Sequence, residues 1–303
     1  MKIINNKKSH KPHDFLKELS ICCDKTNSHL RRLLPPKSEQ KLYDAINYAI
    51  FSGGKRFRAF LVIQAAKLFE IPVVRALQAA SAIEIIHTYS LVHDDLPSMD
   101  NDDFRRGKPT IHIKWDEATA VLVGDALQAF AYQILSFEET HPKSEVRLNL
   151  IRTLSEASGL MGMVLGQSKD LEAEKNNKSL ELKDIINLQK LKTGALFNWS
   201  LKSANILAEQ NHVSLEKYAD SIGLAFQIKD DLLDHEGTME KTGKKVGKDN
   251  AAGKATLVSL LGVENAKKRC IELCEEACDS LDFFGTKSEI LKTAARFTIE
   301  RGF

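Results

Sequence analysis

The sequence predicts an all-α, single-domain bundle of about ten or more helices. Apolar residues recur at i, i+3 and i+4 in nearly every apolar segment, which is the period of an amphipathic helix. Runs of alternating β-branched residues, which would indicate strands, are missing from the sequence. The 16 glycines and 7 prolines fall mostly between the periodic segments, where helix breakers belong.

Six segments carry the helical period most clearly. In chain order they are LYDAINYAIF (42–51), LQAASAIEIIHTYSLV (77–92), EATAVLVGDALQAFAYQIL (117–135), KDIINLQKLKTGALFNWSL (183–201), YADSIGLAFQIKDDLLD (218–234) and ENAKKRCIELCEEACDSL (264–281). Three further stretches are predicted to be loops, namely residues 1–13, 96–110 and 235–254. The first is expected to be a mobile basic tail, so that residues 14–303 form the single domain.

The overall charge gives no reason to expect a nucleic acid or a membrane surface as a partner. Lys and Arg number 43 against 41 Asp and Glu, a net charge of +2. The N-terminal stretch MKIINNKKSHKPHDF lacks the apolar region of a signal peptide, and no segment approaches the length of an apolar transmembrane span. We therefore expect a cytoplasmic protein without membrane insertion.

Five cysteines, an odd number in a long chain without an export signal, favour reduced thiols. Cys270, Cys274 and Cys278 repeat every four residues and would share one helix face. A metal site on this face is the alternative, but three in-line ligands on one helix suit tetrahedral zinc badly. Packing in a helix seam is the preferred interpretation.

An acidic cluster lies in the segment VHDDLPSMDNDDFRRGKP, which has five aspartates within ten residues and then two arginines. Carboxylates so close repel one another, so a cationic partner is expected. The preceding apolar helix carries Glu84, His87 and Asp94 on one face. Because such a helix would be buried, this polar stripe must meet polar groups, ions or a ligand.

Pro97 determines where that helix should end. Proline removes a backbone donor and disfavours helix at the residue before it, so the helix should end near Asp95. Asp100 lies six residues after Asp94, about 240° away on an ideal helix. Asp100 must therefore return toward Asp94 through the loop.

A second acidic cluster lies in QIKDDLLD. Asp230 and Asp234 are one helical turn apart, with Asp231 beside them and Gln227 three residues earlier. Carboxylates are hard oxygen donors, and Mg²⁺ is usually held by one or two of them together with substrate phosphates and water. Either cluster alone is equally well explained by a solvated helix face, but the pair in apolar helices favours metal.

Positive charge is concentrated in GGKRFR, where two glycines precede Lys55, Arg56 and Arg58. Glycine lets a backbone approach an anion closely, and arginine offers a bidentate fork to phosphate oxygens. Further candidates are Arg105, Arg106, Lys192, Lys244 and Lys254.

Two other kinds of anion-binding site could use these basic groups, a P-loop and a nucleic-acid patch. GTMEKTGKK superficially suggests a P-loop, but five residues separate Gly237 from Gly243 and no Ser or Thr follows Lys244. A nucleic-acid patch fits poorly because basic groups alternate with acidic clusters. Adjacent carboxylates and arginines fit a metal-bridged diphosphate better.

Five motifs in this order resemble those of the short-chain trans-prenyl diphosphate synthases. HDDLPSMD with NDDFRRG is similar to the first aspartate-rich motif of that family, and FQIKDDLLD to the second. GGKRFR resembles the diphosphate-binding motif, LQKLKTGALF the central KTG segment, and TGKKVGKDNAAGKATL the lysine-bearing loop. The resemblance is strongest to the farnesyl diphosphate synthases of bacteria. It implies an isoprenoid synthase type fold, with helices around a central cavity, and a homodimer.

The resemblance also implies the site residues. About three Mg²⁺ ions would be held with the substrate diphosphate by Asp94, Asp95, Asp100, Asp230, Asp231 and Asp234. Isopentenyl diphosphate would be bound by Gly54, Lys55, Arg58, His87 and Arg106. The allylic diphosphate would be bound by Arg105, Lys192, Lys244 and Lys254, with Thr193 and Gln227 near the carbocation. The catalytic residues would be Asp94, Asp100, Lys192, Thr193, Gln227 and Asp230.

The implied reaction is a head-to-tail condensation of isopentenyl diphosphate with dimethylallyl or geranyl diphosphate to farnesyl diphosphate. Metal ions assist loss of the allylic diphosphate, and that pyrophosphate accepts the proton, so His87 has a binding role. The alternative for His87 is a core histidine hydrogen-bonded to Glu84. Water would quench the cation, so the site should be apolar and closed by mobile loops.

Tyr89 and Ser90 would determine product length, since they precede Asp94 and lie deeper in the bundle. In the family a bulky residue five positions before the motif tends to stop elongation at fifteen carbons. The alternative is that Tyr89 is an ordinary core aromatic. Rival functions are a geranylgeranyl or geranyl diphosphate synthase, a non-catalytic helical metal-binding subunit, and a terpene cyclase, which would not need GGKRFR.

Overall fold

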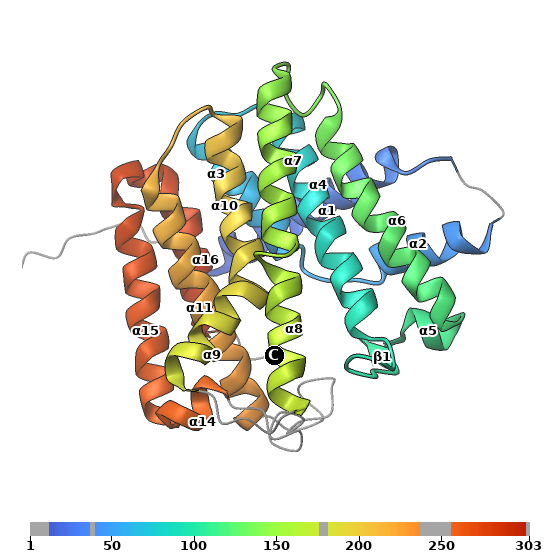
Figure 1. Ribbon diagram of the computed structural model, residues 1–303. Helices are drawn as coiled ribbons and strands as arrows, with labels where there is room; N and C mark the ends of the chain where they lie inside the picture. Colours follow the sequence, from blue (N-terminus) through green and yellow to red (C-terminus); the bar gives the residue numbers. More distant parts are fainter. Residues whose placement is uncertain (1–11, 37–39, 176–180, 237–255, 301–303) are drawn as a thin grey trace, which may run out of the picture.

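The computed structural model describes residues 12–36, 40–175, 181–236 and 256–300. Over these ranges the chain is a bundle of long helices, most of which run up or down the view in Figure 1. The predicted all-α class is confirmed, and each of the six segments with clear helical periodicity is helical.

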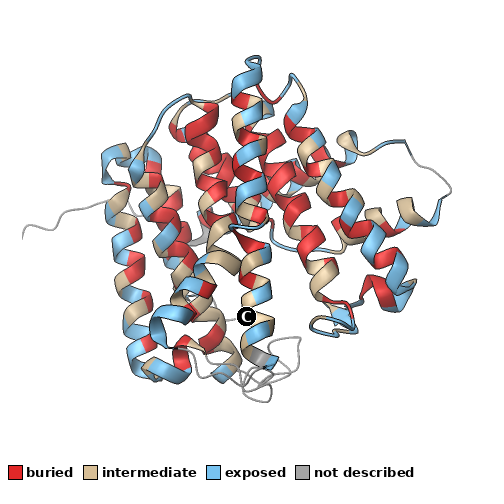
Figure 2. Cartoon of the chain, viewed as in Figure 1, coloured by how far each residue is buried: buried red, intermediate tan, exposed pale blue. Residues whose placement is uncertain are grey.

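Three helices form the centre of the bundle: α3 (Phe57–Leu68), α4 (Val73–Asp94) and α10 (Ala195–Leu207). They are apolar on nearly all faces, and such helices are stable only when surrounded by others. Figure 2 shows their buried residues gathered in the middle of the molecule. α4 packs against α3, α10 and α6 (Glu117–Ser136), so its polar stripe lies inside the protein.

The remaining elements surround this centre. They are α1 (Pro12–Leu33), α2 (Lys41–Phe51), α5 (Ile111–Lys114), α7 (Ser144–Ser158), α8 (Met163–Lys175), α9 (Leu182–Gln189), the π-helix η1 (Lys190–Gly194), α11 (Val213–Glu236), α14 (Leu257–Leu261), α15 (Val263–Ser280), the 3₁₀ segment η2 (Asp282–Ser288) and α16 (Glu289–Glu300). α1 begins at Pro12, so the helix takes in the last two residues of the predicted tail, while residues 1–11 lie outside the described ranges.

The predicted loop 96–110 contains a small antiparallel hairpin that the sequence pattern did not reveal. Its strands are β1 (Phe104–Arg105) and β2 (Lys108–Pro109). The two residues between them, Arg106 and Gly107, have φ of 54° and 72°. A two-residue hairpin turn needs positive φ at both positions, and an arginine at the first is an unusual choice.

α4 ends where Pro97 predicts. The last helical residue is Asp94, and Asp95 is the C-cap. The chain then folds back at once, because the amides of Asp100 and Asp102 donate to the carbonyl oxygens of Asp94 and Asp95 at 2.9 and 3.2 Å.

The cysteines belong to the packing of the bundle. All five are free thiols. Cys274 lies in the large core that runs from α1 to α16, and Cys270 lies in a smaller core between α9, α11, α14 and α15. The preferred interpretation of this helix face as a packing seam is confirmed for these two residues.

In the described chain one helix, α6, is long and apolar enough to cross a bilayer, although no such segment was expected from the sequence. In the structure 44% of that stretch is buried, and the helix packs against α4, α2, α5 and α7. α6 is therefore accounted for as a helix of the bundle, with an apolar face left exposed.

Candidate active site

The first aspartate motif forms a compact acidic turn at the end of α4. Burial, together with the neighbouring carboxylates Asp100 and Asp95, raises the pKa of Asp94 to about 6 against the opposing charges of Lys192 and Arg105. The positive groups of the protein therefore do not fully compensate this carboxylate. An additional cation is what such a site requires.

Asp95 has a different environment from Asp94. Its buried carboxylate is gripped by Arg105, with Nε at 2.7 and 2.9 Å from the two oxygens and Nη2 at 2.5 Å from Oδ1. Arg105 also lies 4.0 Å from Asp102. Such a bidentate pair fixes the plane of the guanidinium. Asp95, a predicted metal ligand, therefore also orients Arg105 in the structure.

Lys192 lies beside the first motif, as a residue of the π-helix η1. Burial lowers the pKa of Lys192, but the charges of Asp170, Asp94 and Asp100 outweigh that effect and raise it overall. Its Nζ is 2.5 Å from Oδ2 of Asp170 on α8. Lys192 thus connects the acidic turn of α4 to α8.

Asp170 and its neighbours on α8 were not among the predicted site residues. Gly166 lies against η1 so closely that a Cβ there would be 2.3 Å from the backbone nitrogen of Lys192. Gln167 has a buried Nε2 atom without a hydrogen-bond partner among the described groups. The available signal was the sequence GQSKD, in which a glycine precedes an amide and a carboxylate in a helical segment.

The second aspartate motif lies on α11 and is connected to the same π-helix. Thr193 Oγ1 donates to Gln227 Oε1 at 3.1 Å, and Gln227 Nε2 donates to Asp231 Oδ1 at 3.0 Å. Asp231 also accepts from the amide of Leu257 at 3.2 Å, which fixes the start of α14. Asp231, a predicted metal ligand, is buried and holds Gln227 and the amide of Leu257 in place.

Asp230 and Asp234 of the same motif are half-buried. The charge of Asp230 acts on Arg58 of α3. The two aspartate motifs thus share neighbours: Lys192 is next to the first, and Thr193, the following residue, is hydrogen-bonded to the second. A π-helix is a rare local geometry that is frequent at functional sites. Here it directs Lys192 toward the motif at the end of α4 and Thr193 toward the motif on α11.

The GGKRFR turn lies against the loop that follows the first motif. Gly53 and Gly54 have φ of 108° and 111°, which L-residues rarely adopt. Arg106 Nη1 donates to the carbonyl oxygen of Gly53, and a Cβ at Gly54 would be 2.6 Å from that same Nη1. Glycine is therefore required at position 54 for the guanidinium of Arg106 to reach this turn.

Arg56 is oriented differently from its neighbours in the turn. The sequence groups it with Lys55 and Arg58 as concentrated positive charge, but Arg56 is only 5% exposed and pairs with Glu84 inside the bundle. Lys55 is exposed, and Arg58 is partly buried with its guanidinium 4.9 Å above the ring of Phe197. Only Lys55 and Arg58 of this motif are thus placed to meet a ligand.

The pKa values of Arg58 and His87 are both lower than usual. Burial lowers the pKa of Arg58 to about 10, opposed by Glu84 and Asp230, and its Nε has no partner among the described groups. Burial and then the charges of Arg58 and Arg106 lower the pKa of His87 well below its usual value. The carboxylate of Glu84 is occupied by Arg56 and the amide of Ala59, which argues against the alternative of a Glu84-bonded core histidine.

The donor set fits Mg²⁺ bound together with a diphosphate. The described residues contain no group of three or more His, Cys, Asp or Glu side chains arranged around one metal position. The carboxylates instead occur in two separate motifs, so oxygens of a diphosphate and of water would complete the coordination. The raised pKa of Asp94 is what a carboxylate suited to a cation would show, and the unpartnered Nε of Arg58 is what a donor suited to an anion would show.

Tyr89 lies one turn before the acidic end of α4 and is only 5% exposed. Burial raises its pKa to about 12, with Tyr132 acting in the same direction and a hydrogen bond to Gln128 opposing it. Its ring meets that of His93 edge-on at 5.6 Å. Ser90 is also buried and donates to the carbonyl of His87 at 3.0 Å. Two other predicted residues, Lys244 and Lys254, lie outside the described residues.

Comparison with known proteins identifies the family. Residues 39–294 match the polyprenyl synthetase family. The chain is 40% identical over 298 residues to a farnesyl diphosphate synthase of Escherichia coli, which covers 95% of this chain and 99% of that one. This protein belongs to the polyprenyl synthetase family, and it is a prenyltransferase.

Solved structures give the same result for the fold. A crystal structure of an FPP/GFPP synthase from Zymomonas mobilis is 43% identical, with a TM-score of 0.87 and coverage of 94% of this chain and 99% of that one. A geranyltransferase from Helicobacter pylori, solved with magnesium and isoprenyl diphosphate, is 32% identical with a TM-score of 0.80 and coverage of 94% and 96%. The predicted isoprenoid synthase fold is confirmed.

Proposed function

We propose that this protein condenses isopentenyl diphosphate with dimethylallyl or geranyl diphosphate to form farnesyl diphosphate, as a single catalytic domain. The observation that carries the proposal is the divergence of two adjacent side chains. Arg105 grips Asp95 in the aspartate motif, whereas Arg106 reaches Gly53 in the GGKRFR turn. One short hairpin therefore joins two sites suited to diphosphates, as a reaction between two diphosphate esters requires.

The allylic diphosphate belongs at the acidic side. Asp94, Asp100, Asp230 and Asp234 would hold about three Mg²⁺ ions between the two motifs and the diphosphate oxygens. When bound, the metal supplies Lewis-acid neutralisation of the leaving diphosphate. Asp95 and Asp231 support this arrangement by orienting Arg105 and Gln227.

Basic residues complete the allylic half of the site. Lys192 and Arg105 are held beside the first motif and would bind the outer oxygens of the leaving group, with Lys244 and Lys254 as further proposed ligands. To bind the diphosphate, Lys192 must share its ammonium with Asp170, which keeps it protonated. Thr193 and Gln227 would place their oxygen dipoles near the cation that develops.

Isopentenyl diphosphate belongs at the basic side. Its oxygens would be bound by Lys55, Arg58, His87 and Arg106. Gly54 leaves the space that the guanidinium of Arg106 requires. His87 is neutral in the free protein, so it can donate one hydrogen bond without adding another charge beside the arginines. In this proposal no protein group acts as the base, since the departing pyrophosphate accepts the proton.

Product length is proposed to be limited by Tyr89 with its neighbour Ser90. Tyr89 is buried against α6 through Gln128, so its ring would lie across the path of a growing hydrocarbon chain. A longer product is the second candidate, since one of the similar structures is an FPP/GFPP synthase.

A homodimer is proposed from the exposed apolar face of α6 and its surroundings. Val121 and Leu122 of α6 are 42% and 53% exposed, and Leu160 and Met161 before α8 are 84% and 75% exposed. Exposed apolar side chains that lie together are typical of protein interaction sites. We further place the protein in the cytoplasm, without membrane or nucleic-acid partners.

The test is an assay of the purified protein with Mg²⁺, labelled isopentenyl diphosphate and each allylic diphosphate. Products are dephosphorylated and separated by chain length. The proposal expects incorporation of label into a fifteen-carbon alcohol from either starter. A twenty-carbon or longer main product would support the second candidate, and no incorporation with any starter would contradict both.

A further inference from the structure

Arg56 adopts a conformation that needs support from elsewhere in the fold. Its φ and ψ are 51° and 43°, in the left-handed region that residues with a Cβ rarely adopt. It is the N-cap residue of α3 and lies between Lys55 and Arg58. The conformation of this single residue therefore sets how these two basic side chains leave the backbone.

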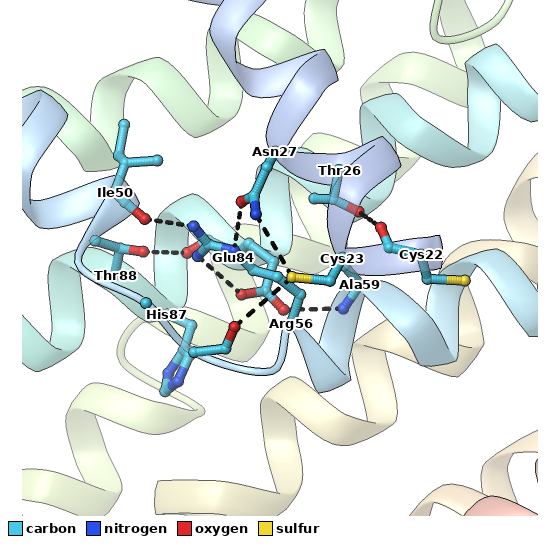
Figure 3. Close-up of polar contacts among 12 residues, drawn as sticks. Cys22, Cys23, Thr26, Asn27, Ile50, Arg56, Ala59, Glu84, His87 and Thr88 are labelled. Carbon is cyan, nitrogen blue, oxygen red and sulfur yellow. Dashed lines mark hydrogen bonds and ion pairs between the residues drawn. The ribbon is translucent and has the colours of Figure 1, made fainter. Parts of the chain in front are cut away.

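Three separate helices hold Arg56 in that conformation. Its Nε donates to Asn27 Oδ1 of α1 at 3.0 Å, Nη2 donates to the carbonyl of Ile50 in α2, and Nη1 is 3.4 Å from Glu84 Oε2 of α4. Figure 3 shows the guanidinium enclosed by these partners. Since Arg56 is only 5% exposed, it cannot reach a diphosphate without leaving all of them.

Glu84 of α4 supports both segments proposed to bind isopentenyl diphosphate, which are the start of α3 and the part of α4 around His87. Its second oxygen accepts from the amide of Ala59 at 3.0 Å, which caps the start of α3 where Arg56 itself provides no side-chain cap. Glu84 lies one turn before His87 on α4. The same carboxylate thus ties the start of α3 to the part of α4 that carries His87.

Asn27 brings α1 into contact with the same turn. Its Nδ2 donates to Cys23 Sγ at 3.5 Å, and that thiol lies 3.8 Å from the carbonyl oxygen of Gly54. Cys23 and Asn27 lie before residue 39, where the match to the family begins.

We propose that Arg56, held by Asn27 and Glu84, is a positioning residue for isopentenyl diphosphate: it sets the geometry of Lys55, Arg58 and His87 without touching the substrate. This inference rests on the proposed function, in which Lys55, Arg58 and His87 bind isopentenyl diphosphate. A buried ion pair is by itself weak support for stability, since apolar replacements are often neutral, whereas its geometry can specify one arrangement of the groups around it. The effect should therefore appear in substrate affinity.

The experiment measures binding of isopentenyl diphosphate alone by calorimetry, and KM values for both substrates. The variants are R56M, R56K and N27A. We expect R56M to weaken isopentenyl diphosphate binding about tenfold, which corresponds to about 1.4 kcal/mol, with the KM for geranyl diphosphate unchanged. R56K should restore little, because lysine lacks the fork that meets three partners. N27A should weaken binding about threefold.

A matched control separates positioning from general loss of stability. T153V removes another buried hydrogen bond, which Thr153 accepts from Trp199 Nε1 at 3.1 Å between α7 and α10. It should lower the unfolding temperature without changing either KM. If R56M and N27A bind isopentenyl diphosphate as tightly as the wild type, or if both KM values rise together, the inference is overturned. Failure of the wild type to bind isopentenyl diphosphate would overturn the proposed function as well.

Discussion

The amide nitrogen of Asp100 lies 2.9 Å from the carbonyl oxygen of Asp94 and donates a hydrogen bond to it. The six-residue spacing would place the two side chains on different sides of an ideal helix. The hydrogen bond instead folds the loop back, so that the charge of Asp100 acts on the carboxyl group of Asp94. Two carboxylates from helix and loop are thereby available to the same cations.

Replacing Asp94 should abolish most activity. We expect D94N to lower kcat by at least about 100-fold, because the loss removes charge stabilisation that is used in the transition state. The matched control is D103N, since Asp103 is an exposed aspartate of the same loop. D103N should retain activity within about twofold, as surface substitutions usually do. Equal losses in the two variants, measured in the same condensation assay, would contradict the role of Asp94.

Removing Asp170 should change the dependence on Mg²⁺. Without this partner, the ammonium of Lys192 is drawn toward Asp94 and Asp100, whose charges it already feels. It would then compete with the metal, so D170N should raise the Mg²⁺ concentration for half-maximal activity by about three- to tenfold. D220N is the control, because Asp220 of α11 accepts an exposed hydrogen bond from Asn198 of α10. An unchanged Mg²⁺ titration of D170N would exclude this role.

Shortening Tyr89 should lengthen the product. Y89A removes a buried ring between α4 and α6, and we expect products of twenty or more carbons from chromatography of the dephosphorylated alcohols. Y89F keeps the ring and loses only the hydroxyl that bonds to Gln128, so it should still stop at fifteen carbons. A fifteen-carbon product from Y89A would reject the role in chain length and leave Tyr89 as a core residue.

The lowered pKa of His87 should make stability depend on pH. Its pKa in the folded protein lies below the value of about 6.5 in an unfolded chain, so below pH 6.5 the unfolded state binds more protons. This contribution to stability is complete above that pH and is lost as the pH falls. In denaturant titrations between pH 6.5 and 5, H87N should show a slope of unfolding free energy smaller by up to about 1.4 kcal/mol per pH unit. Identical slopes would show that His87 binds protons alike in the folded and unfolded states, which would contradict a lowered pKa.

A charge on the exposed face of α6 should dissociate the proposed dimer. We expect L122E to shift the mass measured by light scattering from a dimer to a monomer, because an unpaired carboxylate would be buried in the interface. V213E is the control, since Val213 is 55% exposed at the start of α11. A wild-type monomer, or a dimer that L122E leaves intact, would argue against this face as the interface.

Local patterns in the sequence were sufficient for the fold class and for choosing the residues of the candidate site. The helical period predicted the bundle, and Pro97 predicted the end of α4 to within one residue, because both act over a few residues of backbone. The clustering of carboxylates and arginines predicted a metal and diphosphate site for the same reason. The hairpin at 104–109 was missed, since its turn relies on an arginine with positive φ.

Which charge meets which partner was decided by the tertiary structure. The sequence alone determined that this protein has two acidic motifs and a basic turn in a helical bundle. Only the packed chain decided that Arg56 turns inward to Glu84, that Arg105 and Arg106 diverge, and that Lys192 pairs with a residue on α8. The physical reason is that such pairs join residues far apart in the chain, so their energies exist only after the helices have packed.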